Sequence, residues 1–194
     1  MISLNQLLES RDARAQHQMD LLGRFPGKSL LCLTVQLPGP EKRNQQSLTI
    51  AKAGVSAIRQ AFQPDYEELR DLETGYEGYF LVSIPALEAK RKAVELEDNH
   101  PLGRLMDIDV LSILPNAPDE KYFSGRYPKN HFPSGSTTPT RISAISREDI
   151  GLQPRRCLLC ENEVRYCMRA KTHTTSELLE RIEQLLKEYE LQTS

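Results

Sequence analysis

Short apolar segments alternate with helical segments along the first part of the chain, and this order limits the fold more than any other feature. The apolar segments have the length of single strands, and the segments between them repeat apolar residues at helical spacing. The expected elements are a strand at 29–37, a helix at 42–62, a second strand within 65–74, a turn at 75–78, a strand at 79–84, a helix at 86–98 and a strand at 105–113. This order predicts an α+β fold with a ferredoxin-like βαββαβ-type antiparallel sheet and packed helices.

Helical additions are expected at both ends of this unit. Residues 3–22 begin with Ser3 and Gln6, which have the spacing of a capping box. Thr174 and Glu177 repeat that spacing at the start of the C-terminal helix. Both additions are amphipathic, so each is expected to pack an apolar face against the rest of the protein.

The whole chain, residues 1–194, is interpreted as a single domain, because its length is that of one compact unit. Its C-terminal helical segment, 155–194, carries a group of Cys, Arg and His residues. Residues 115–140 are rich in proline and glycine and predict a long surface loop. That loop is either a tolerated insertion or a lid over the site.

Charge and hydropathy exclude several partners. The net charge of −2 argues against a nucleic-acid-binding protein, which usually carries a basic excess. No apolar run approaches the roughly 18 residues of a membrane-spanning helix. Charged residues at 10–14 interrupt the stretch where a secretory signal needs an apolar core, so a cytoplasmic location is expected. The four cysteines are then reduced thiols or metal ligands.

The segment His-Pro-Leu-Gly-Arg-Leu-Met-Asp-Ile-Asp-Val at 100–110 carries the most informative candidates. On a strand, Asp107 and Asp109 point the same way, about 7 Å apart. Two such carboxylates can hold Mg²⁺ and bridge it to substrate phosphates, although an Asp-x-Asp pair is also typical of a solvated sheet face. Arg104 offers a forked donor to phosphate, and Gly103 permits a close backbone approach.

A second cluster combines Cys157, Cys160 and Cys167 with His173, a ligand set typical of zinc. Two other interpretations stay open. The thiols can be packed as small buried apolar groups. The segment can instead form a phosphate or nucleotide pocket lined by Arg156, Arg169, Lys171 and His173.

Four ordered segments together resemble one family. They are Leu-Glu-Ser-Arg-Asp-Ala-Arg at 8–14, Pro-Gly-Pro-Glu-Lys at 38–42, the 100–110 segment, and Arg-Cys-Leu-Leu-Cys at 156–160 followed by Cys167, Arg169 and His173. The chain is similar in these segments to the CitX family of apo-citrate lyase phosphoribosyl-dephospho-CoA transferases, or citrate lyase holo-acyl-carrier-protein synthases.

The resemblance implies a nucleotidyltransferase. Its donor would be 2′-(5″-triphosphoribosyl)-3′-dephospho-CoA and its acceptor a serine of the citrate lyase acyl-carrier subunit, with pyrophosphate released. Asp107 and Asp109 match the family's Asp-x-Asp and are interpreted as Mg²⁺ ligands. Arg104 is expected to be catalytic with the two aspartates and, like Lys42 and Arg11, to contact phosphate. The expected substrate-binding residues are Gly103, Arg11, Lys42, Arg156, Arg169 and His173.

A basic rim is expected to guide the usually acidic carrier protein, and its candidates are Arg155, Arg156, Arg169 and Lys171. Two alternatives stay open. One is the equivalent transferase for the carrier subunit of malonate decarboxylase. The other is a non-catalytic, zinc-stabilised module for citrate lyase assembly.

Overall fold

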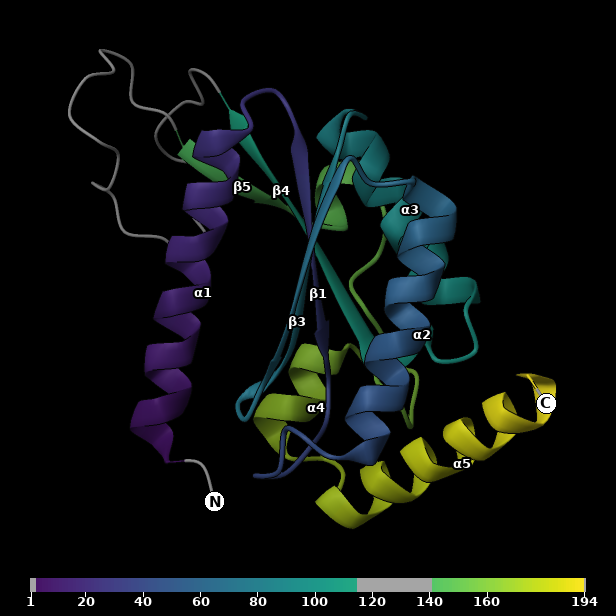
Figure 1. Ribbon diagram of the computed structural model, residues 1–194. Coiled ribbons are helices and arrows are strands. Elements are labelled where there is room, and N and C mark those ends of the chain that lie inside the picture. The colour runs from purple at the N-terminus through teal and green to yellow at the C-terminus, as the bar shows by residue number, and fades with distance from the viewer. Residues whose placement is uncertain (1–2, 115–140, 194) are drawn as a thin grey trace.

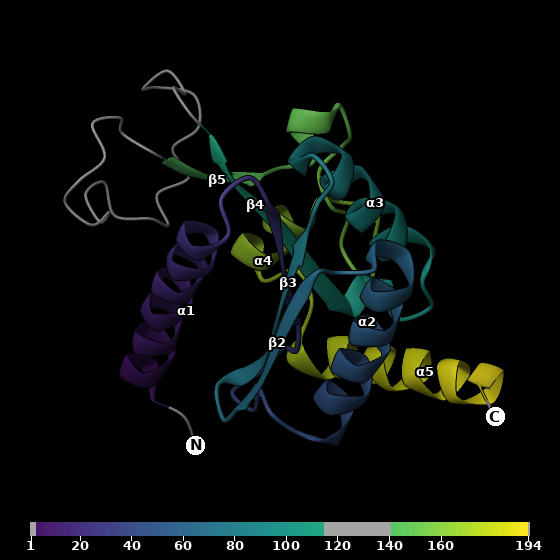
Figure 2. The ribbon, with the colours of Figure 1, turned by 45° about the horizontal axis from the view of Figure 1, so that its top comes forward.

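A five-stranded antiparallel sheet forms the centre of the protein, with the strand order β2-β3-β1-β4-β5. The computed structural model describes residues 3–114 and 141–193. The strands are β1 (Ser29–Val35), β2 (Tyr66–Leu72), β3 (Gly75–Val82), β4 (Met106–Leu114) and β5 (Arg141–Ile145). Figure 2 shows β2 and β5 at opposite edges of this sheet.

Helices cover both faces of the sheet. In Figure 1, α1 lies on one side and α2 and α3 lie together on the other. The helices are α1 (Leu4–Arg24), α2 (Gln45–Phe62), α3 (Ala86–Asn99), α4 (Val164–Ala170) and α5 (Thr175–Thr193), with short 3₁₀ turns η1 (Gly103–Leu105) and η2 (Glu148–Ile150). No helix among the described residues is long and apolar enough to cross a bilayer.

The predicted α+β class and ferredoxin-like order are confirmed, because the first four strands and the two crossover helices have the βαββαβ arrangement. Capping boxes occur where they were expected, at Ser3 with Gln6 and at Thr174 with Glu177. The helices α1 and α5 are the predicted additions at the two ends.

Two predictions about strands need correction. The turn predicted at 75–78 is wrong, because these residues form the first half of β3. The hairpin turns earlier, since Leu72 pairs with Gly75 and leaves only two residues between the strands. The fifth strand was not predicted at all. The loop proposed at 115–140 lies outside the described residues.

Alternation along the strands divides the apolar residues between two cores. Leu31 and Ile108 face α2 and α3 in the larger core. Leu30 and Leu111 face the opposite side and pack with Leu22 of α1. Any residue of β4 that is two positions from Leu111 therefore projects toward the α1 face, which sets the direction of the two aspartates.

Candidate functional site

The Asp107 and Asp109 side chains project from β4 toward the α1 face of the sheet. In the β1–β4 ladder Asp107 is opposite Thr34 and Asp109 is opposite Cys32, which belongs to the α1-side core. Both aspartates are partly exposed, and both line one pocket. The same-face geometry predicted from the strand period is therefore present.

The pocket opens where the sheet edge is incomplete. β5 pairs with β4 only from Val110 to Leu114, so within residues 3–114 and 141–193 no strand pairs with the first half of β4 on that side. Side chains of α3 bind the backbone there instead. Lys90 Nζ donates to the carbonyl of Ile108 at 3.1 Å, and the amide of Ile108 donates to Glu97 Oε1 at 2.8 Å. The edge is hydrogen-bonded without a sixth strand, which leaves space beside the aspartates.

Basic side chains surround this pocket, which we call the aspartate pocket. Its charged lining residues are four cations and four carboxylates: Lys90, Arg147, Arg155, Arg165, Glu97, Asp107, Asp109 and Glu148. Cations and carboxylates in one pocket favour a ligand that carries both phosphate groups and a divalent cation, because each charge then meets its opposite.

Arg155 forms ion pairs with Asp107 and with Glu97 of α3. Its Nη1 lies 3.7 Å from Asp107 Oδ1, and its Nη2 lies 3.5 Å from Glu97 Oε1. Nη2 also donates to the carbonyls of Gly103 and Met106. Its Nε and Nη1 are buried without a hydrogen-bond acceptor, so the guanidinium has donors available for an oxyanion.

Sequence reasoning assigned Arg155 to a docking rim and missed its place in the pocket. The only sequence signal was its position directly before the Arg-Cys-Leu-Leu-Cys segment. Arg14 belongs to the 8–14 segment that resembles the family, but it was given no role of its own. Its Nε donates to Glu77 Oε1 at 2.7 Å, on the sheet face toward which the aspartates project.

Tyr79 and Cys32 complete the polar row on that face. The Tyr79 hydroxyl donates to Glu77 Oε2 at 2.5 Å, and burial together with this hydrogen bond raises the tyrosine pKa strongly. Burial, followed by the charge of Asp109, raises the pKa of the Cys32 thiol. Both groups are therefore neutral near pH 7 and add no negative charge beside the aspartates.

Arg104 lies outside the aspartate pocket. Its Nη2 donates to the backbone carbonyls of Arg156 and Cys157, and burial lowers its pKa. It lines a second pocket with Asp98, Arg147 and Arg156, so Arg147 borders both pockets. In this structure Arg104 fixes the segment that follows Arg155.

The remaining predicted contacts are distributed over other surfaces. Lys42 Nζ donates to the carbonyl of Leu37 at 2.6 Å, and burial lowers its pKa. Arg156 forms an ion pair with Glu161. Arg11 and Arg169 are exposed, and neither is among the residues that line the aspartate pocket.

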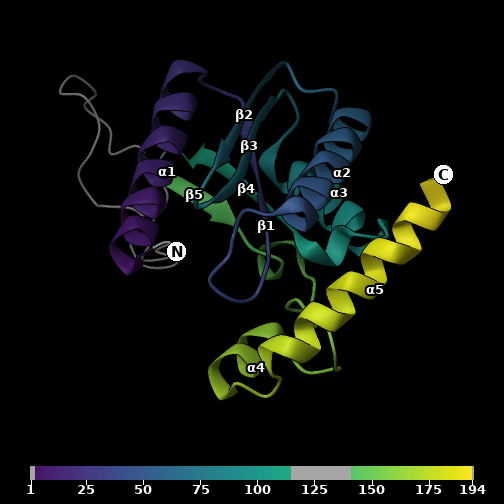
Figure 3. The same ribbon diagram turned by 60° about the horizontal axis from the view of Figure 1, so that its bottom comes forward.

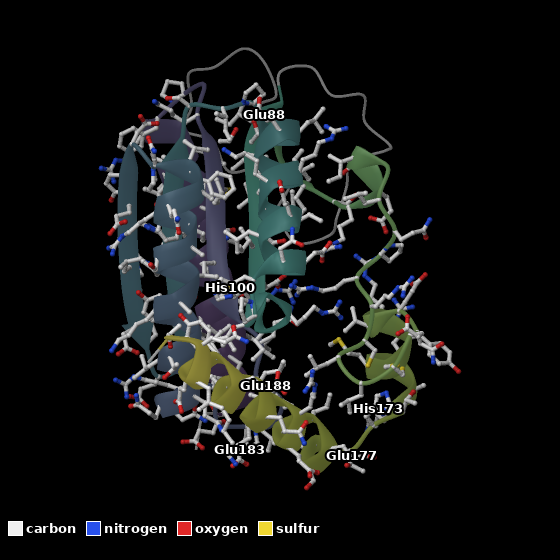
Figure 4. All side chains as sticks on the ribbon, turned by 90° about the vertical axis from the view of Figure 1, so that its right-hand side faces the viewer. Glu88, His100, His173, Glu177, Glu183 and Glu188 are labelled. Carbon is white, nitrogen blue, oxygen red and sulfur yellow. The ribbon has the colours of Figure 1, made fainter. Side chains whose placement is uncertain are left out.

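The second cluster converges as its residue types predicted. One ligand atom from each of Cys157, Cys160, Cys167 and His173 lies within 4.8 Å of every other. Cys160 Sγ lies 3.5 Å from Cys167 Sγ and 3.3 Å from His173 Nε2. Figure 4 shows His173 next to the sulfur atoms at α4. These thiols are free and can hold a metal ion.

With the geometry established, comparison with known proteins decides the family. The chain matches the family model described as apo-citrate lyase phosphoribosyl-dephospho-CoA transferase (CitX) over residues 2–118 and 138–189. The chain belongs to this family. The resemblance found in the four segments is confirmed, and the chain is a member of a transferase family.

Curated relatives of this transferase family match nearly the whole chain. The apo-citrate lyase phosphoribosyl-dephospho-CoA transferase of Escherichia coli O7:K1 is 37% identical over 192 residues, covering 96% of this chain and 90% of the relative. The probable apo-citrate lyase phosphoribosyl-dephospho-CoA transferase of Streptococcus pyogenes serotype M18 is 35% identical over 191 residues, covering 97% and 87%. The match therefore includes both the aspartate pocket and the cysteine cluster.

Gly103 of the 100–110 segment has a packing role that predicts a measurable effect. A Cβ at this position would lie 2.3 Å from the Glu97 carbonyl oxygen of α3, so Gly103→Ala has to displace backbone. We expect the free energy of unfolding to fall by about 2–3 kcal/mol in urea denaturation. Gly23→Ala is the matched control, because a Cβ on Gly23 meets nothing within 4 Å and alanine favours the helix. Equal stabilities of the two variants would contradict this account.

Proposed function

We propose that this protein transfers the phosphoribosyl-dephospho-CoA group from 2′-(5″-triphosphoribosyl)-3′-dephospho-CoA to a serine of the citrate lyase acyl-carrier subunit. The observation that carries the proposal is the aspartate pocket, where two carboxylates on one strand face share a pocket with Lys90, Arg147, Arg155 and Arg165. Membership of the family supports the same conclusion, since its relatives are named for this transfer.

The reaction joins the serine oxygen to the phosphorus nearest the ribose of the donor. The bond from that phosphorus to the bridging oxygen of the pyrophosphate breaks, and pyrophosphate leaves with the electron pair. The serine proton passes to a base, and we propose that the carboxylate of Asp107 or Asp109 accepts it. The cationic wall of Arg147 and Arg155 stabilises the negative charge that develops on the leaving group.

We further propose that Asp107 and Asp109 hold Mg²⁺. Their oxygens are the hard ligands that this ion prefers, and both side chains are accessible from the pocket. When bound, Mg²⁺ would supply charge neutralisation on the triphosphate. Arg155 is then positioned to bind a phosphate oxygen beside the pair, because two of its donors have no acceptor.

The basic residues that do not line the aspartate pocket are proposed to contact the donor's dephospho-CoA end or the carrier protein. Arg11 follows Ser10, whose hydroxyl lies 2.8 Å from the Thr74 hydroxyl in the β2–β3 turn, and Lys42 lies against Gly75 in the same turn. We propose that these two cations contact the dephospho-CoA end of the donor.

Arg156 is exposed and lines the second pocket. Arg169 is exposed on α4, the helix that carries the cluster residue Cys167. We propose that Arg156 and Arg169 form the surface that binds the acidic carrier, and that Arg104, Gly103 and His173 support this surface. A cytoplasmic location fits four free thiols. We also propose that the cysteine cluster binds zinc and not the catalytic magnesium, because thiolates are soft ligands.

Mass spectrometry of the apo-carrier subunit tests the proposed function. After incubation with the donor, Mg²⁺ and this protein, the citrate lyase carrier should gain the mass of the prosthetic group and pyrophosphate should appear. The malonate decarboxylase carrier is the specificity control and should gain far less. If the malonate decarboxylase carrier were modified faster than the citrate lyase carrier, the malonate decarboxylase carrier would be the acceptor. An unmodified citrate lyase carrier without pyrophosphate would contradict the proposal and favour an assembly module.

A further inference from the structure

We infer that one zinc ion bound by Cys157, Cys160, Cys167 and His173 holds Arg155 in the aspartate pocket, so that zinc occupancy controls the transferase site. The segment 156–173, which we call the knuckle, carries all four ligands and begins next to Arg155. The inference deepens the proposed function and depends on it for the activity measurement only.

The separations between the ligand atoms are close to those of a closed tetrahedral site. Zinc bonds of about 2.3 Å to sulfur and 2.0–2.1 Å to nitrogen place neighbouring ligand atoms roughly 3.5–3.8 Å apart. The Cys160–Cys167 and Cys160–His173 separations are 3.5 and 3.3 Å, and all four ligand atoms lie within 4.8 Å of one another. Four protein ligands leave no open position, which is typical of structural and not catalytic zinc.

A disulfide explains these distances less well. A sulfur–sulfur bond is about 2.05 Å long, far below the separation of Cys160 and Cys167, and it would leave Cys157 and His173 unused. Packing of reduced thiols does not require an imidazole nitrogen against a sulfur. The convergence of all four groups on one point is explained by a shared metal ion.

The knuckle has little apolar core of its own. Its buried side chains are the ligands Cys157 and Cys167, whereas Tyr166 and Met168 of α4 are 60% and 72% exposed. Figure 3 shows α4 at one end of the molecule. A segment this short cannot bury enough apolar surface to fix its fold, so metal binding has to supply that stability.

A short chain of backbone contacts connects the knuckle to the aspartate pocket. The amide of Val164 donates to the Arg155 carbonyl at 2.9 Å, and Arg156 forms a β-bridge with Glu163. The amide of Cys157 donates to the Asn162 carbonyl at 2.7 Å. These contacts join the two ends of the loop 156–163, and one of them is made by the backbone carbonyl of Arg155.

Arg155 lies outside every helix and strand. Its guanidinium is held by Glu97 and the carbonyls of Gly103 and Met106, whereas its backbone is held by this closed loop. Val164 and Arg165, at the start of α4, line the aspartate pocket with it. Without zinc the loop loses the ion that ties Cys157 and Cys160 to α4. The guanidinium is then no longer held against Asp107, and the start of α4 leaves the pocket wall.

Zinc content tests the first half of the inference. Elemental analysis of the purified protein should give about one zinc per chain, and Co²⁺ replacement should produce the visible absorption of a tetrahedral thiolate site. Cys160→Ser and His173→Ala should each lose most of the metal. Cys32→Ala removes a cysteine of β1 outside the cluster and should keep it. A zinc-free native protein, or a Cys160–Cys167 disulfide in its place, would overturn the inference.

Hydrogen exchange and activity test the coupling. Removal of zinc by a chelator should accelerate amide exchange in peptides covering 154–165 while β1 and β3 stay protected, and should lower transfer by about 10–100-fold. Added zinc should restore both. Met168→Ser, an exposed change in the knuckle, should alter neither. Arg155→Lys should keep its zinc and its slow exchange but lose activity, which separates the ion's role from that of the guanidinium.

The two proposals fail differently. If the zinc-loaded protein does not modify the carrier, the proposed function is wrong, whereas zinc content and exchange still decide the structural link. If zinc-free protein keeps native exchange at 154–165 and full activity, the inferred coupling is wrong although the transferase function stands.

Discussion

Replacement of Asp109 by asparagine is expected to reduce transfer to the carrier by at least about 10²–10³-fold, the loss seen when a charge-stabilising group is removed from an active site. Asparagine has nearly the same shape, so the fold should survive. It removes the charge that would bind the divalent ion and the base that would accept the serine proton. Asp107→Asn should have a similar effect, because both carboxylates line the same pocket. The rate of mass gain on the apo-carrier measures both variants.

Glu88→Gln provides the matched control for these variants. Glu88 is an exposed carboxylate in the first turn of α3 and is not among the residues that line the aspartate pocket. Its replacement removes the same charge and should leave the transfer rate within about twofold, since surface changes of this kind have small effects. An Asp107→Asn, Asp109→Asn double variant with wild-type activity and normal melting would eliminate the proposed metal site.

Glu97→Ala should lower the free energy of unfolding by about 3–5 kcal/mol, the usual loss when one partner of a buried ion pair is removed. The Glu97 side chain is only 4% exposed and lies 3.0 Å from Arg147 Nη2 and 3.5 Å from Arg155 Nη2. It also accepts the backbone amide of Ile108 at the open edge of β4. Its removal leaves that amide and much of the positive charge of two arginines without a partner. Urea denaturation measures the effect.

Asp98→Ala is the control for Glu97→Ala. Asp98 pairs with the same arginine, Arg147, at 2.9 Å, but its side chain is 45% exposed. Exposed ion pairs contribute roughly 0–1 kcal/mol, so this variant should be nearly as stable as the wild type. Similar losses for the two variants would show that burial of Glu97 contributes little.

Local sequence patterns predicted the elements whose signals lie within a few residues. Strand alternation placed Asp107 and Asp109 on one face, because the period of two holds in any sheet. The capping box at Thr174 and Glu177 marked the start of α5, because its signal is a pair of residues only three positions apart. The converging cysteines were identified by residue type, since few environments need three thiols and an imidazole.

Local patterns of this kind could not predict contacts between segments that are distant in the sequence. Arg104 lies within the 100–110 segment and Arg155 directly precedes the Arg-Cys-Leu-Leu-Cys segment, yet of these two only Arg155 lines the aspartate pocket. Their places depend on how the segment after β5 returns past η1, and no local periodicity encodes that path. The strand β5 has five residues, too few to show a reliable alternation. The Arg14–Glu77 pair joins residues 63 positions apart and depends on the docking of α1.

The occupied backbone groups at the free edge of β4 restrict how an acceptor can arrive. Lys90 and Glu97 already satisfy the carbonyl and the amide of Ile108, so an incoming peptide finds no row of vacant groups with which to extend the sheet. The same hydrogen bonds also keep this strand edge from pairing with the strand edge of a second copy of the protein. The acceptor hydroxyl should accordingly approach on a protruding tip of a folded carrier, such as a turn or the beginning of a helix, and an unfolded peptide with the same serine should be a poor substitute.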